Sequence, residues 1–95
     1  MVEASMIVTK RVFVEGMVQG VGFRFHTQRQ AAQLGVNGWV RNLEDGRVEV
    51  LIQGAQLVVT SMLEWLKKGP QRARVDKLTE TAEESMERFG SFDVR

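Results

Sequence analysis

Hydrophobic and polar residues alternate along two stretches of the chain, a pattern that predicts half-buried β-strands. In residues 6–15, valines alternate with charged or aromatic residues, and residues 47–53 show the same alternation around three β-branched side chains. Residues 36–42 have the composition of another strand. The turn-forming residues 43–46 therefore predict a hairpin that joins this strand to the one after it.

Two further stretches carry their hydrophobic residues at the spacing of an α-helix. We predict helices over residues 23–34, with Gly35 as the stop, and over residues 55–68, with two lysines in the last turn and Gly69-Pro70 beyond it. The expected buried faces consist of Phe23, Thr27, Ala31 and Leu34 in the first helix and Ala55, Val59, Met62 and Leu66 in the second.

The last quarter of the chain completes a regular order of elements. We predict a strand over residues 74–81, an acidic loop over 82–90 and a short strand over 91–95, and we expect residues 1–5 to form a loose tail. The order β-α-β-β-α-β predicts an α+β, ferredoxin-like sandwich with an antiparallel sheet of four or five strands and both helices on one face. In that topology the carboxyl ends of the first two strands lie at one edge, about 10 Å apart.

The connection between the first strand and the first helix is rich in glycine. Gly16, Gly20 and Gly22 allow positive φ angles or a close approach of the backbone to a ligand. Residues 16–26 contain no Ser, Thr, Asp or Asn that could cap the first amides of the helix. Free amides, the helix dipole and the planar guanidinium of Arg24 together favour an anion such as phosphate.

Several well-known phosphate loops do not fit this segment. A Walker loop starting at Gly16 would need Gly-Lys-Ser/Thr where Val21 and Gly22 stand, and a dinucleotide-binding turn starting at Gly20 would need glycine in place of Phe25. A cysteine phosphatase needs a thiolate, and the chain has no cysteine. Taken alone, the loop is therefore either a phosphate cradle or a glycine-rich connection beside a surface arginine.

Composition narrows the range of functions. The 95 residues, 43% of them hydrophobic, suit one domain over residues 1–95. A net charge of +1 with no long basic block argues against nucleic acid as a partner. No apolar run is long enough for a membrane span or a signal peptide, so we expect a cytoplasmic protein without a membrane partner. We also expect a monomer. With no cysteine and a single histidine, we expect no disulfide, no metal site and no cofactor.

Two short motifs carry a resemblance to a known family. Residues 18–24, Val-Gln-Gly-Val-Gly-Phe-Arg, and residues 38–42, Gly-Trp-Val-Arg-Asn, followed by Asp45-Gly46, resemble the acylphosphatase family, and the likeness extends from about Arg11 to the end of the sequence. The resemblance implies that Arg24 binds the phosphoryl group with the loop amides and that Asn42 positions a water molecule. The implied phosphate-binding residues are Val18, Gln19, Gly20, Val21, Gly22, Phe23 and Arg24.

The candidate residues themselves limit the reaction. The sequence suggests no Ser-His-Asp arrangement, no paired carboxylates and no metal cluster, so a poor alkoxide leaving group would receive no assistance. A carboxylate, whose conjugate acid has a pKa of about 4, leaves unaided. We therefore expect a small acyl phosphate as the substrate, with inorganic phosphate or sulfate as a competing anion.

Other prominent residues have simpler explanations, and two other functions stay open. We expect His26 to point away from Arg24, because it lies two positions further along the helix. We expect Trp39 to pack against the sheet and Arg41 to be a solvated charge on the opposite face, because neighbouring strand residues face opposite sides. One alternative is a noncatalytic module, which either binds a phosphorylated or acidic ligand or is a fragment similar to the acylphosphatase-like part of a larger maturation protein. The other alternative is an RNA-binding domain of similar topology. The latter would need stacking aromatic residues, which residues 47–53 lack.

Overall fold

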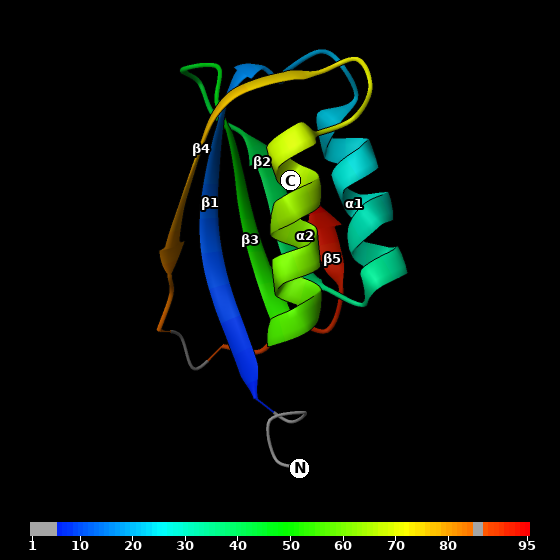
Figure 1. Cartoon of the computed structure of the whole chain (residues 1–95), viewed down its shortest axis with the longest axis vertical. Coiled ribbons are helices and arrows are strands. Elements are labelled where there is room, and N and C mark those ends of the chain that lie inside the picture. The colour runs from blue at the N-terminus through cyan, green and yellow to red at the C-terminus, as the bar shows by residue number, and fades with distance from the viewer. Residues whose placement is uncertain (1–5, 85–86) are drawn as a thin grey trace.

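The computed structural model describes residues 6–84 and 87–95, in which two helices cover one face of a five-stranded sheet (Figure 1). The elements are β1 (Ile7–Met17), α1 (Phe23–Leu34), β2 (Asn37–Asn42), β3 (Val48–Ala55), α2 (Gln56–Lys68), β4 (Arg74–Ala82) and β5 (Phe92–Val94). This arrangement confirms the predicted ferredoxin-like fold. The tail predicted at residues 1–5 and residues 85–86 of the predicted acidic loop lie outside the described residues.

Strand β3 is the centre of the sheet, whose order is β4-β1-β3-β2-β5. It runs antiparallel to β1 and to β2, and Val50 pairs with Val12 on one side and with Val40 on the other. These three valines are fully buried, and they pack with α1 and α2 residues such as Phe23 into one hydrophobic cluster. Burial of an aliphatic or aromatic side chain of this size contributes about 1.5–3 kcal/mol, so this cluster fixes the helices on one face.

The sheet is mixed, whereas the sequence predicted an antiparallel one. Strand β5 pairs with β2 in parallel, with Gly38 opposite Phe92 and Val40 opposite Val94. The reason is the path of the chain, because β4 and β5 lie at opposite edges and the segment between them carries the chain from one edge to the other. Three residues are too few to show any alternation, so the direction of β5 left no signal in the sequence.

The boundaries of the helices follow the sequence signals. Helix α1 occupies the predicted residues 23–34 and ends at Gly35, which has a φ of 77° and whose N–H donates to the oxygen of Ala31. Helix α2 begins one residue later than predicted and buries Leu63 in addition to three of the expected residues. No helix in the described part of the chain combines the length and the apolarity needed to span a membrane.

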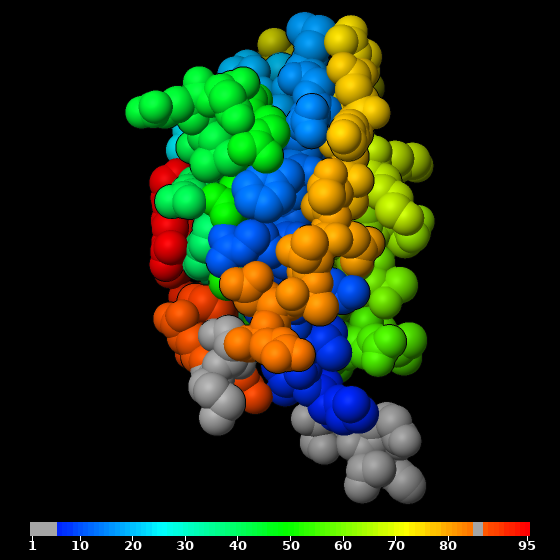
Figure 2. Space-filling model, turned by 90° about the vertical axis from the view of Figure 1, so that its left-hand side faces the viewer, coloured from blue at the N-terminus to red at the C-terminus, as the bar shows by residue number. Residues whose placement is uncertain are grey.

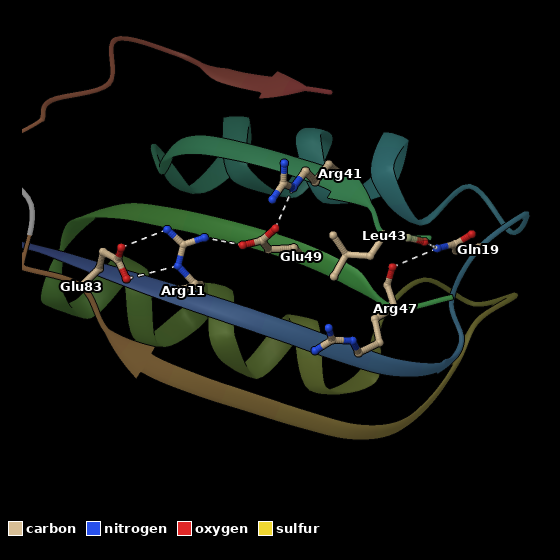
Figure 3. Close-up of polar contacts among 7 residues, drawn as sticks. All are labelled: Arg11, Gln19, Arg41, Leu43, Arg47, Glu49 and Glu83. Carbon is tan, nitrogen blue, oxygen red and sulfur yellow. Dashed lines mark hydrogen bonds and ion pairs between the residues drawn. The ribbon is translucent and has the colours of Figure 1, made fainter. Parts of the chain in front are cut away.

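The face of the sheet without helices is covered by its own long side chains. Glu49 and Gln53 on β3 are each only 3% exposed, although the alternation predicted a half-buried strand. Arg11 from β1 and Arg41 from β2 both pair with Glu49, and Arg11 also pairs with Glu83 (Figure 3). Figure 2 views the molecule from the side of β1 and β4, whose side chains lie next to one another there.

Candidate functional site

The glycine-rich loop leaves the first turn of α1 open. Gly22 is the N-cap residue with a φ of 78°, and no side chain among the described residues caps the helix; its first turn has no acidic residue. Gly20 has a φ of 76°, which other residues rarely adopt. The first amides of a helix have no partner within it, so this end presents unpaired donors and the positive end of the helix dipole.

These donors lie at a pocket of about 310 Å³ that is built from four parts of the chain. The loop and the start of α1 form one side, and the ends of β2 and β5 contribute the rest. The lining residues are Val18, Gly20, Gly22, Phe23, Arg24, Phe25, Gln28, Asn42 and Val94. The structure thus brings Arg24 and Asn42, which lie on different elements, to the same pocket.

Arg24 brings positive charge to this pocket. Its Nη1 donates to the backbone oxygen of Arg95 at 2.9 Å. Within the described residues, none of the ion pairs that the structure forms joins Arg24 to an aspartate or glutamate. A guanidinium has five N–H donors in a fixed plane, so most of them remain available to a phosphoryl group.

Asn42 is the last residue of β2 and pairs with Val48 of β3. It is exposed, and two residues earlier on the same face lies the buried Val40. Its side-chain amide makes no hydrogen bond to any other described residue. An unpaired carboxamide can both accept and donate, so it can orient a water molecule at the pocket.

The hairpin after Asn42 is held by its own turn residues. The backbone N–H of Arg47 donates to Oδ1 of Asp45 at 3.1 Å, and Nε of Arg47 donates to Oδ2 at 2.8 Å. Both bonds lower the pKa of the Asp45 carboxyl below its usual value, and the bond from the backbone N–H has the larger effect. Asp45 therefore stabilises the turn. This structural role explains the Asp45-Gly46 part of the motif without a role for Asp45 in the reaction.

Two of the predicted phosphate-binding residues turn their side chains elsewhere. The Gln19 carboxamide donates to backbone oxygens of the hairpin (Figure 3). Val21 lines a different hollow together with His26, Arg29 and other residues of α1 and the loop after α2. Their predicted role concerns their backbone amides and stays a prediction, while His26 lies away from the pocket of Arg24, as expected.

Arg41 and Trp39 belong to the opposite face of the sheet. Nε of Arg41 lies 2.6 Å from Oε1 of Glu49, and its guanidinium carbon lies 5.2 Å from the centre of the Trp39 ring. Trp39 is 6% exposed, which confirms its packing role. Arg41 is on the predicted face, but it is held by a carboxylate and an indole ring and is not simply solvated.

A larger groove of about 530 Å³ lies between α2 and strands β1 and β4. Its charged lining residues are paired, Lys10 with Glu80, Lys67 with Glu64, and Glu83 with Arg11. Because these charges neutralise one another, the groove offers little net attraction for a charged ligand. The smaller pocket is therefore the better candidate for an anion site.

Three lining residues were missed by the sequence analysis. Gln28 follows Arg24 by one helical turn, so the helical periodicity could have identified it. Phe25 and Val94 are 56% and 42% exposed and give the pocket an apolar part. Val94 reaches the pocket through the parallel pairing of β5, which no sequence pattern indicated.

Comparisons with known proteins show which family the chain is similar to. The Acylphosphatase family model matches residues 10–94. An acylphosphatase of Acaryochloris marina is 43% identical over 88 residues, which cover 93% of this chain and 94% of the relative. The structure of an acylphosphatase from Coxiella burnetii matches with a TM-score of 0.91 and 33% identity over 100% of both chains. HypF from T. kodakarensis matches with a TM-score of 0.82 and 30% identity over 95% of this chain and 12% of its own length. The chain therefore belongs to the acylphosphatase family of hydrolases.

Proposed function

We propose that this chain hydrolyses small acyl phosphates to a carboxylate and inorganic phosphate, without a metal ion. The loop of residues 18–24 and Arg24 hold the phosphoryl group, and Asn42 orients the attacking water. The observation that carries this proposal is the single pocket lined by Gly20, Gly22, Arg24 and Asn42. This pocket combines a guanidinium that uses one nitrogen for a bond to Arg95, the open first turn of α1, and the Asn42 carboxamide, which has no partner among the described residues.

The lining of the pocket supports an acyl phosphate rather than an alkyl phosphate. None of its lining residues is an Asp, Glu, His or Cys, so the pocket supplies no general acid for an alkoxide leaving group. A carboxylate needs no such assistance, because its conjugate acid has a pKa of about 4. The apolar side chains of Phe25 and Val94 suit the carbon skeleton of an acyl group.

The reaction then depends on position and charge. The loop amides and the Arg24 guanidinium bind the phosphoryl oxygens and stabilise the charge that builds up on them. Asn42 holds water in line with the bond to the acyl oxygen, and the water oxygen attacks phosphorus. The bond from phosphorus to the acyl oxygen breaks, its electron pair leaves with the carboxylate, and the water proton passes to a phosphoryl oxygen of the substrate.

Inorganic phosphate and sulfate should compete with the substrate, because both fit a cradle of amides and a guanidinium. The cytoplasmic location and the monomeric state remain predictions from the sequence.

The experiment is an assay of phosphate release from benzoyl phosphate, with EDTA present throughout and an alkyl phosphate monoester as the comparison substrate. We expect full activity on benzoyl phosphate, little or none on the monoester, and competitive inhibition by inorganic phosphate. Arg24→Ala serves as the control for contaminating activity. Loss of activity in EDTA with recovery on adding a divalent ion, or equal rates on both substrates, would refute the proposal.

A further inference from the structure

The side chain of Gln19 connects the phosphate loop to the hairpin between β2 and β3. Its Nε2 lies 2.8 Å from the backbone oxygen of Leu43 and 2.9 Å from that of Arg47 (Figure 3). A carboxamide nitrogen has two hydrogens, and both are used here. One side chain of the loop therefore holds both strands of the hairpin.

The two carbonyl groups belong to the residues that close the hairpin. The N–H of Leu43 donates to the oxygen of Arg47 at 2.8 Å, and the N–H of Gly46 donates to the oxygen of Leu43 at 3.2 Å. Asn42 directly precedes Leu43 and pairs with Val48 across the ladder. The ladder fixes Asn42 relative to β3, but only Gln19 ties this end of β2 to the loop by a side-chain hydrogen bond among the described residues.

We propose that Gln19 is a positioning residue that sets the distance between the Asn42 carboxamide and the phosphoryl group. Its side chain faces the hairpin and not the pocket, so it acts on the position of Asn42, not as a phosphate ligand. This inference rests on the proposed function, because it assigns Gln19 an effect on the water that Asn42 orients. A displacement of about 1 Å in a catalytic group lowers a rate by roughly 10²-fold.

The test uses Gln19→Met, which keeps the length of the side chain, removes its donor and adds no charge near the anion site. We expect kcat on benzoyl phosphate to fall by about 10- to 10²-fold while the inhibition constant of inorganic phosphate stays nearly unchanged. Gln19→Asn, which retains a carboxamide on a shorter side chain, is a milder second variant and should show a smaller fall in kcat. Circular dichroism reports whether each variant is folded.

A matched control comes from the other end of β2. Nδ2 of Asn37 donates to the backbone oxygen of Phe89 at 2.8 Å, which is the same kind of bond at a distance from the pocket. Asn37→Leu should leave kcat and phosphate inhibition unchanged. A fall in kcat like that of Gln19→Met would mean that any weakened β2 lowers the rate, and would overturn the specific role of Gln19.

A double-mutant cycle with Asn42→Ala separates this inference from the proposed function. If Gln19 acts through Asn42, adding Gln19→Met to Asn42→Ala causes no further loss of kcat. Losses that multiply, or a Gln19→Met variant that binds phosphate weakly, would reject the positioning role and leave the function intact. Full kcat in Asn42→Ala would instead refute the proposed role of Asn42, and the inference with it.

Discussion

Arg24 and Arg41 lie on opposite faces of the molecule and differ in what surrounds them. Arg41 lies within β2, contacts the Glu49 carboxylate and lies over the Trp39 ring. Arg24 lies in the first turn of α1 and donates to a backbone oxygen of Arg95, and no Asp or Glu among the described residues pairs with it. An arginine whose charge is already neutralised stabilises the fold, whereas one with unused donors at a pocket can bind an anion.

The same contrast separates Arg41 from its neighbour in sequence. Asn42 has no hydrogen-bond partner for its side chain among the described residues, and it lies at the pocket while Arg41 lies behind the sheet. Alternation of side chains along β2 is the cause. Proximity to a motif in the sequence is therefore a weaker guide to function than the face of the strand.

The largest expected effect concerns the two arginines directly. Arg24→Ala should lower kcat/KM for benzoyl phosphate by about 10³-fold or more, because the guanidinium contacts charge in both the ground and the transition state. Arg24→Lys should recover little activity, since lysine lacks the planar fork. Steady-state kinetics would measure both.

Arg41→Ala is the matched control, because Glu49 keeps its partner Arg11 in that variant. Its kcat/KM should stay within a few-fold of the original protein. Similar losses from both substitutions would remove the distinction between the two faces.

A smaller effect should separate two glycines with nearly identical geometry. Gly20 and Gly35 have φ angles of 76° and 77°, and an added Cβ meets nothing within 4 Å at either position. Valine should therefore strain both positions alike, by about 1–2 kcal/mol in the free energy of unfolding. Only Gly20→Val should also weaken phosphate inhibition, by about tenfold or 1.4 kcal/mol, because only Gly20 lies at the pocket.

Thermal unfolding and inhibition by inorganic phosphate would measure this pair. Equal phosphate affinity in the two variants would mean that the loop is only a connection.

His26 should have little effect on the reaction. It lines a separate hollow with Arg29 and Trp65, so His26→Ala should stay within about tenfold of the original kcat, whereas a positioned acid or base is worth about 10² to 10⁴. A larger loss, or phosphate bound covalently to His26, would contradict direct attack by water.

The smallest expected effect is on the thermal stability of the protein, through the Glu83 carboxyl on the face of the sheet without helices. Hydrogen bonds from Arg11 lower the pKa of Glu83 below its usual value. A carboxyl with a lowered folded-state pKa stabilises the fold above its unfolded pKa of about 4.3, and this contribution disappears as the pH falls. Glu83→Gln should therefore lower Tm slightly at pH 7 and not at about pH 3, with unchanged kcat. A Tm difference that grows in acid would have the wrong sign.

The sequence predicted most of the fold because its signals were local. The helices were located by the glycines that end them, Gly35 and Gly69, and the strands β1 and β3 by their alternating valines. The loop was identified by its glycines and by the lack of a capping side chain at the start of α1. The direction of β5 and the burial of Glu49 could not be predicted, because both depend on contacts between distant strands.

The candidate site was predictable where a short motif or the order of the elements locates a residue. Arg24 and Asn42 were placed together by topology and by resemblance, and the pocket contains both. The Gln19 side chain bonds to Leu43 and Arg47, which lie 24 and 28 positions further along the chain. A glutamine in a glycine-rich loop gives no indication of such distant partners. Val94 was missed for the same reason, since it reaches the pocket from the other end of the chain.

The different roles proposed for Asn42 and Arg24 can be tested by measuring kcat and the dissociation constant of inorganic phosphate in Asn42→Ala, side by side with Arg24→Ala. We expect Asn42→Ala to lower kcat by about 10² to 10³-fold while phosphate binds nearly as before, because Asn42 contacts water and not the phosphoryl group. Arg24→Ala should lose both. Loss of phosphate binding in Asn42→Ala with normal turnover of bound substrate would contradict the division of roles between the two residues.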